Sequence, residues 1–476
     1  MQVVDGQQRL LTLTLLATSL YREALANGRT ALGDRIRADF LETIDYESDE
    51  PTPRIMLADP ADNRTLARIL AGEAVDEASL PGPEESLSRG LLAAYQFIND
   101  RLHRDLAVDP FRRLGMWNEF LDNRLQFALF IHPDPSSAYR VFEVINTRGK
   151  QLTTADLLKN YLLSQTAASE QDRQYSRWQA VAKPLADYGP NTFVQFIRHL
   201  VTVRAGHVLP KDLFDYLAQR RPGPRPAPPV NELLDLLTGG LPLYLQMIDP
   251  SLEGPAKAGW LRVFGALGEL NVIAVRPLLV AISEVQDPQE GMERVLELVV
   301  RRIVVGNLGT GNVERRLSDA ARSVYESKRW EPALHALRDL NPSRFEFESQ
   351  LGTRSFNKGT LEFLRRSIVQ RTKTPTDTGY LHLIRPRHAA AWDGFNEDEV
   401  SYWGSTIGNS LLTSVERRPF GALTWAGAQN NLITKAVEDE WSDTLQSFAR
   451  WGPSEVAELG RELARVAVDT WYDDGG

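Results

Sequence analysis

Apolar residues recur at helical spacing along most of the chain, and this pattern predicts a mainly helical protein. The most regular stretch near the start, Leu10 to Tyr21, predicts a buried helix. Further helices are expected at 34–41, 66–71, 87–102, 136–145, 193–203, 213–217, 233–247, 272–285, 295–304 and 451–471. Short apolar runs beside proline or turn residues predict strands at 3–4, 54–57 and 125–131, and residues 379–386 and 407–412 are also strand-like. The expected fold class is therefore α+β, predominantly helical.

The first polar motif lies between the pair Val3-Val4 and the helix that begins near Leu10, and it predicts a strand, a tight turn and a helix. The first backbone N–H groups of a helix lack partners within it and favour an anion such as a phosphate. Arg9 could add a planar pair of donors for the same group. The alternative is structural: a turn whose polar side chains cap a core helix.

A second polar motif occupies Phe142 to Leu163. Its run of Thr153, Thr154, Ala155 and Asp156 is typical of a helix start, in which Asp156 would serve as a cap, and Lys159 would share its face. Asn146 is expected in the turn between two helices. Capping and ligand binding are both open for Asp156.

Composition narrows the protein class. The chain has 476 residues, enough for several domains, and its net charge of −9 argues against a broadly basic nucleic-acid binder. The absence of cysteine excludes disulfides and thiolate metal sites. No signal peptide is evident, and the most apolar run, Val272 to Ile282, is too short to span a bilayer, so a cytoplasmic protein without membrane contact is expected.

DGQQR, at residues 5–9, followed by a Leu/Thr-rich helix, and FEVINTRGKQLTTADLLKNYLL, at residues 142–163, together resemble two ordered motifs of the GmrSD-type family. The resemblance implies a ParB-like α/β nucleotide-binding domain at 1–165, incomplete at its N-terminus, because the family carries further strands before DGQQR. It also implies a helical spacer at 166–370 and a small ββα domain of HNH (His-Me finger) type at 371–476.

The resemblance further implies which residues bind a nucleoside triphosphate, GTP or ATP. Those residues are Asp5, Gly6, Gln7, Gln8, Arg9, Asn146, Gly149, Asp156 and Lys159. We expect the two motifs to meet in space, with Asn146 and Asp156 near Gln8 and Arg9.

The C-terminal region matches the family's nuclease motif less cleanly. His382 would be the general base and, with Asn409, a ligand of Mg²⁺ or Mn²⁺, but it stands one position early and needs a bulge in its strand to face the site. His388 is a second candidate for the base. Arg418 stands where the family has a second Asn, and a guanidinium cannot ligate a cation. We therefore expect a degenerate metal site.

Four arginines near this motif, Arg385, Arg387, Arg417 and Arg418, predict a local patch for DNA phosphates, and the alternative is a solvated charged surface. The resemblance thus implies a nucleotide-regulated DNA endonuclease of modification-dependent restriction or phage defence. The alternative is a non-catalytic nucleotide- or DNA-binding sensor subunit, or a truncated inactive paralogue. DNA and a nucleotide are the expected partners, and self-association stays open.

Overall fold

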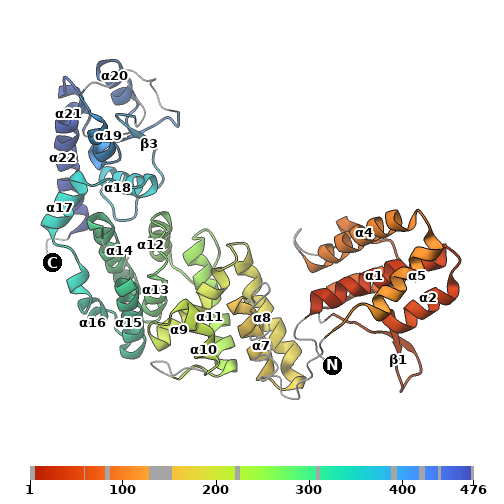
Figure 1. Ribbon diagram of the computed structural model, residues 1–476. Coiled ribbons are helices and arrows are strands. Elements are labelled where there is room, and N and C mark those ends of the chain that lie inside the picture. Colours follow the sequence, from red (N-terminus) through yellow and green to blue (C-terminus); the bar gives the residue numbers. More distant parts are fainter. Residues whose placement is uncertain are drawn as a thin grey trace. The chain divides into compact units, whose positions relative to one another are not determined.

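The computed structural model describes residues 6–57, 59–80, 86–127, 153–219, 226–306, 311–386, 394–417, 424–437 and 441–472. Contacts between residues divide the chain into two compact units, residues 1–151 and 152–476 (Figure 1). The predicted division at residues 165 and 370 stays a prediction. The fold class is α+β and predominantly helical, as expected, with two small two-stranded sheets among the described residues.

The described part of the first unit consists of helices and one hairpin. Its elements are α1 (Gln7–Ala26), α2 (Thr30–Ile36), a π-helical turn (Arg37–Leu41), β1 (Glu42–Ile44), β2 (Pro51–Pro53), α3 (Pro60–Ala71), a 3₁₀ turn (Glu77–Ser79), α4 (Leu87–Leu106) and α5 (Pro110–Asn123). Helix α1 is central, because Leu11 and Leu15 pack toward α3 and α4, while Ala17 and Leu20 join α2, α4 and α5.

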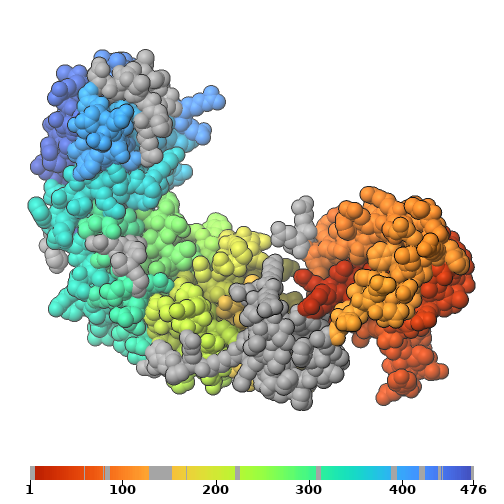
Figure 2. Space-filling view, in the orientation of Figure 1, coloured from red at the N-terminus to blue at the C-terminus, as the bar shows by residue number. Residues whose placement is uncertain are grey.

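The hairpin of β1 and β2 replaces the strand expected at residues 54–57. Glu42 pairs with Pro53, and the Arg54 N–H bonds to the Leu41 carbonyl, so pairing ends where the next strand was expected. The hairpin projects from the helices of this unit (Figure 2), and Tyr46 at its tip is 98% exposed. The strand expected at 3–4, the helix expected at 136–145 and residues 128–131 of the strand expected at 125–131 lie outside the described residues, and residues 125–127 form no strand.

The second unit begins with a helical array. Its elements are α7 (Thr154–Ser164), a 3₁₀ turn (Ala168–Glu170), α8 (Gln171–Ala186), α9 (Thr192–Ala205), a 3₁₀ turn (Pro210–Asp212), α10 (Leu213–Leu217), α11 (Val230–Ile248), α12 (Ala258–Glu269), α13 (Arg276–Ser283), α14 (Pro288–Val305), α15 (Gly311–Ser327), α16 (Glu331–His335), a 3₁₀ turn (Arg338–Leu340), α17 (Arg344–Thr353) and α18 (Lys358–Gln370). The sequence analysis predicted α9, α10 and α11 within about three residues of their bounds, whereas α14 begins at Pro288 rather than Val295, and α8, α12, α15, α16, α17 and α18 had no expected range of their own. Helix α13 starts later than expected, at Arg276, because Pro277 fits a first helical turn.

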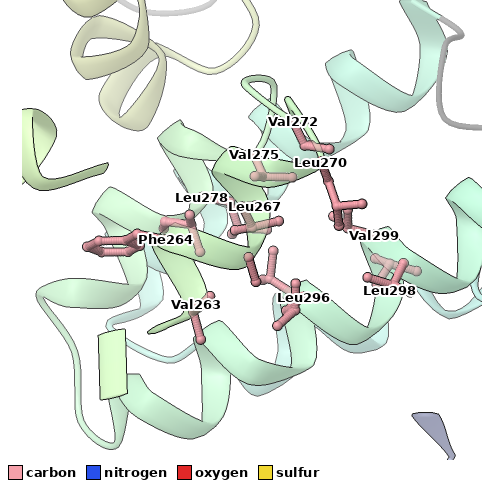
Figure 3. Close-up of a cluster of buried hydrophobic side chains, with 14 of the residues drawn as sticks. Val263, Phe264, Leu267, Leu270, Val272, Val275, Leu278, Leu296, Leu298 and Val299 are labelled. Carbon is pink, nitrogen blue, oxygen red and sulfur yellow. The ribbon is translucent and has the colours of Figure 1, made fainter. Parts of the chain in front are cut away.

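The remaining elements of the second unit surround a small antiparallel sheet. They are β3 (Tyr380–Leu383), α19 (Glu397–Trp403), a 3₁₀ turn (Ile407–Asn409), β4 (Ser410–Thr413), α20 (Trp425–Lys435), α21 (Ser442–Ser447) and α22 (Pro453–Trp471). A single hydrophobic core runs from Leu158 to Trp471. Figure 3 shows its centre, where Phe264 and Leu267 of α12 lie near Leu278 of α13 and Leu296 of α14.

Glycines allow a close contact between two helices of this unit. A Cβ on Gly460 of α22 would lie 2.6 Å from the carbonyl oxygen of Gly352 in α17, and one on Gly408 would lie 2.1 Å from the carbonyl oxygen of Val456. Real Cβ atoms do not approach backbone so closely. The packing of α17, α22 and the turn before β4 therefore requires glycine at these positions.

None of the described helices is long and apolar enough to cross a membrane.

Candidate functional site

The predicted helix after DGQQR begins at Gln7, and its start is exposed. Gly6 precedes it with φ 85°, a left-handed conformation that favours glycine, and its carbonyl accepts the first helical bond from Leu10 N–H at 2.9 Å. Gln7, Gln8 and Arg9 are exposed, whereas Leu11 is buried. Buried leucines thus anchor the helix while its first turn faces solvent. Asp5 lies outside the described residues.

This helix start has the features of an anion site. A helix of this length carries a partial positive charge at its N-terminus, and its first turn contains no acidic residue to neutralise that charge. A Cβ built on Gly6 meets no atom within 4 Å, so a ligand could approach the backbone closely. Arg9 adds a full positive charge one turn along.

The second motif forms the start of α7, and the capping interpretation of Asp156 is confirmed. The Thr153 hydroxyl accepts from Asp156 N–H at 3.2 Å, and the Asp156 carboxylate accepts from the Thr153 hydroxyl at 2.7 Å and from Thr153 N–H at 3.4 Å. Lys159 Nζ lies 3.5 Å from Asp156 Oδ1, on the same helix face as expected. Binding of a nucleotide by Asp156 and Lys159 stays a prediction.

The predicted meeting of this motif with Gln8 and Arg9 stays a prediction. Asn146 and Gly149 lie outside the described residues, and α7 belongs to the second unit.

Residues 1–163 match the family model of the GmrSD restriction endonuclease N-terminal domain. The match takes in both polar motifs, from the start of α1 to Leu163 in α7. No curated protein matches the chain. The GmrSD similarity therefore covers the first unit and α7, and the rest of the chain has to be judged from its own geometry.

His382, the predicted base, lies in β3 without the expected bulge. Residues Tyr380–Leu383 pair in continuous register with Ser410–Thr413, and His382 stands opposite Leu411. Its Nε2 lies 2.9 Å from the Val415 carbonyl oxygen. Because a carbonyl only accepts, Nε2 must carry the hydrogen of this bond.

Asn409, the other predicted catalytic residue, is 1% exposed, and four hydrogen bonds occupy its side chain. Oδ1 accepts from Arg385 N–H at 2.9 Å and from Trp451 Nε1–H at 3.1 Å. Nδ2 donates to the carbonyls of Arg385 and Gly404, both at 3.1 Å. A carboxamide has two acceptor and two donor positions, so Asn409 has none left for a ligand.

The predicted metal site does not fit this arrangement. A metal would need a lone pair of Asn409 Oδ1, and both are used within the protein. Within the described parts of the chain no group of three or more His, Asp or Glu converges as metal ligands would. The roles of His382 and Asn409 in catalysis stay predictions, and Asn409 instead joins β3, the turn after α19 and the start of α22.

The predicted arginine patch is divided between buried and exposed positions. Arg385 is 6% exposed, donates to the Pro386 carbonyl at 2.8 Å and stacks 4.9 Å from the Phe395 ring centre. Burial lowers the pKa of its guanidinium. Arg385 is thus largely buried beside Phe395, and its part in DNA binding stays a prediction. Arg417 is exposed, and Arg387 and Arg418 lie outside the described residues, as does His388.

The sequence analysis missed a buried polar network around His199. Arg198 approaches His199 Nε2 at 3.3 Å and can only donate, so His199 Nδ1 carries the hydrogen and donates to the Tyr244 hydroxyl at 2.8 Å. Arg198 also pairs with Glu314 at 2.7 Å. Burial, followed by the charges of Arg198 and Arg276, lowers the pKa of His199 well below its usual value. His199 is thus a neutral packing residue, which an apolar helix pattern cannot reveal.

A second missed network surrounds Glu297, whose side chain is 4% exposed. Its carboxylate pairs with Arg301 at 3.1 Å, Arg294 at 3.2 Å and Lys373 at 2.7 Å. Arg301 Nε also donates to the Trp471 carbonyl at 2.8 Å, at the end of α22. These contacts join α14 to the last described helix.

Proposed function

We propose that this chain is a restriction-type protein that acts on DNA under the control of a bound nucleoside triphosphate. The observation that carries the proposal is the match of residues 1–163 to the GmrSD restriction endonuclease N-terminal domain. The endonuclease activity for which that family is named supports DNA as the target. Its N-terminal domain would be the regulatory part of the molecule.

The start of α1 is the proposed phosphate site. The N-terminal end of α1, the absence of an acidic residue in its first turn and the charge of Arg9 all favour an anionic ligand. Gln8 carries an exposed carboxamide able to pair with a ribose or a base. GTP or ATP would place its phosphates on the helix start and the Arg9 side chain.

For the C-terminal part we propose DNA contact without cutting by this chain on its own. The four bonds of Asn409 leave no metal ligand at that position. A second candidate function, DNA cleavage, has one observation in its favour: Nε2 of His382 bonds to the Val415 carbonyl, which leaves Nδ1 as the ring nitrogen that could take part in proton transfer.

Nucleotide binding is tested by titrating labelled GTP and ATP against the wild type, Arg9→Ala and Arg64→Ala. Arg64 is also an exposed arginine of the first unit, in α3, and serves as the matched control. Loss of a charge-assisted hydrogen bond worth about 1.5–3 kcal/mol should weaken binding about tenfold or more in Arg9→Ala alone. Failure of both nucleotides to bind the wild type below millimolar concentration, or equal weakening in the two variants, would contradict the proposal.

Cleavage is tested with supercoiled plasmid and with modified phage DNA, in Mg²⁺ or Mn²⁺ and a triphosphate. We expect no metal-dependent nicking, and weak DNA binding that falls steeply with salt. His382→Ala is the informative variant, because removing Asn409 also removes four structural bonds. Nicking by the wild type that disappears in His382→Ala would replace this proposal with the endonuclease function.

A further inference from the structure

A cavity of about 570 Å³ lies in the second unit between the end of α7 and the first turns of α8 and α11. Its volume is within the range of small-molecule sites. Side-chain amides dominate the polar part of its described lining, namely Gln165, Gln174, Gln219 and Asn231. The proposed function assigns no role to any of them.

The polar wall is oriented by a chain of hydrogen bonds. Arg177 donates to Asp235 at 2.5 Å and to Gln174 Oε1 at 3.3 Å, and Gln174 Nε2 donates to Asn231 Oδ1 at 3.0 Å. Because a guanidinium only donates, each amide in this chain has a fixed orientation. Gln174 is 7% exposed and lies behind the exposed Asn231. The Nδ2 group of Asn231 is therefore presented as a donor at the cavity.

The other walls supply an aromatic ring and few charges. Tyr161 lines the cavity, and its ring is held by an edge-to-face contact with Phe214 at 6.4 Å. None of the described lining residues is Lys or Arg, and the carboxylate of Glu170 lies 3.5 Å from Arg173. The described lining therefore favours an uncharged ligand.

We propose that this cavity binds a nucleobase or nucleoside. Planar bases present acceptors and donors along one edge, which side-chain amides recognise, and their faces stack on aromatic rings. Asn231 Nδ2 donates to an acceptor on the base edge, and Tyr161 contributes the ring. The site shares no residue with the helix start at Gly6–Arg9, so the two assignments can fail independently.

The test is calorimetric titration of the full chain with adenosine, guanosine, cytidine and thymidine, one at a time. These nucleosides carry no phosphate and do not depend on the α1 site. Asn231→Asp keeps the acceptor for Gln174 and replaces only the outward donor, and a carboxylate in the first turn of α11 suits the helix dipole, so the variant should fold. Glu232→Gln, at the neighbouring exposed position outside the cavity lining, is the control.

We expect at least one nucleoside to bind the wild type and Glu232→Gln with equal affinity, and to bind Asn231→Asp at least tenfold more weakly. Arg9→Ala should leave nucleoside binding unchanged. Absence of binding by all four nucleosides up to millimolar concentration overturns the proposal. Equal nucleoside affinities of the wild type and Asn231→Asp also overturn it. Loss of nucleoside binding in Arg9→Ala would overturn it too, because it would place the nucleoside at the start of α1.

Discussion

Replacing Asn409 by alanine should destabilise the C-terminal part of the second unit severely. The substitution removes four hydrogen bonds at 2.9–3.1 Å, all in a side chain that is 1% exposed. It leaves the N–H and carbonyl of Arg385, the carbonyl of Gly404 and the indole N–H of Trp451 without these partners. Each buried polar group that loses its partner costs about 1–3 kcal/mol, and water entering the space can satisfy some of them. We therefore expect a loss of about 3–5 kcal/mol.

Urea unfolding followed by tryptophan fluorescence measures this loss directly. Trp451 is fully buried and stacks on Trp425 with ring centres 5.0 Å apart, so its emission reports on the affected region. Asn431→Ala is the matched control, because Asn431 is exposed on α20 and alanine is the better helix former there. The control should unfold at the same or slightly higher urea concentration than the wild type.

Two results would refute the reasoning about Asn409. Equal unfolding midpoints for Asn409→Ala and the wild type would mean that the four bonds do not stabilise the fold. Stabilisation of the wild type by Mg²⁺ or Mn²⁺ that is absent in Asn409→Ala would instead assign the side chain to a metal.

Three further stability predictions follow from buried contacts. Gly460→Ala should lower the urea unfolding midpoint, because its Cβ would lie 2.6 Å from the Gly352 carbonyl oxygen. The control is Gly265→Ala in α12, whose Cβ meets nothing within 4 Å and which should stabilise the protein by about 0.5–1 kcal/mol. Equal effects of the two substitutions would contradict the close contact. Glu297→Gln should cost about 3–5 kcal/mol in the same assay, because it leaves the buried guanidinium of Arg301 without its carboxylate. In the folded protein the pKa of His199 lies below its usual value near 6.5, so the unfolded chain binds the proton first as the pH falls, and stability should decrease below about pH 6.5. Thermal midpoints measured against pH test this assignment. The decline should be smaller in His199→Gln than in the wild type.

Local signals in the sequence predicted most of the helices. The run from Thr153 to Asp156 predicted the start of α7, and the structure has the complete capping box there. The apolar spacing of Leu10 to Tyr21 predicted α1. Helix α5 was not expected, although Asp109 caps it, Pro110 begins it, and Phe111, Leu114, Trp117 and Leu121 recur at helical spacing. Capping and periodicity depend on residues a few positions apart, and a single sequence displays them directly.

The contacts that decide the candidate sites join residues far apart in the chain. Asn409 matches a motif position, but its partners Gly404, Arg385 and Trp451 come from separate segments, and only their arrangement shows that all four bonding positions are used. The motif likewise shows Arg385 as a cation near the predicted site, but it does not show that Phe395 packs against its guanidinium. A sequence motif shows which side chain stands at a position. Whether that side chain still has a free donor or acceptor for a ligand depends on the tertiary packing around it.

The hydrogen bond from Arg301 to the Trp471 carbonyl has a consequence for how the protein folds during synthesis. One core extends from Leu158 to Trp471, and α22 fills a full side of it with Leu459, Leu463 and other buried residues. During synthesis α14 leaves the ribosome before α22. Until α22 has been made, the charges of Glu297 and Arg301 stay solvated and the apolar surface beside them stays exposed. A nascent chain halted before Trp471 would present that surface to chaperones and proteases. The second unit is therefore expected to reach its stable form only after translation has passed its last helix.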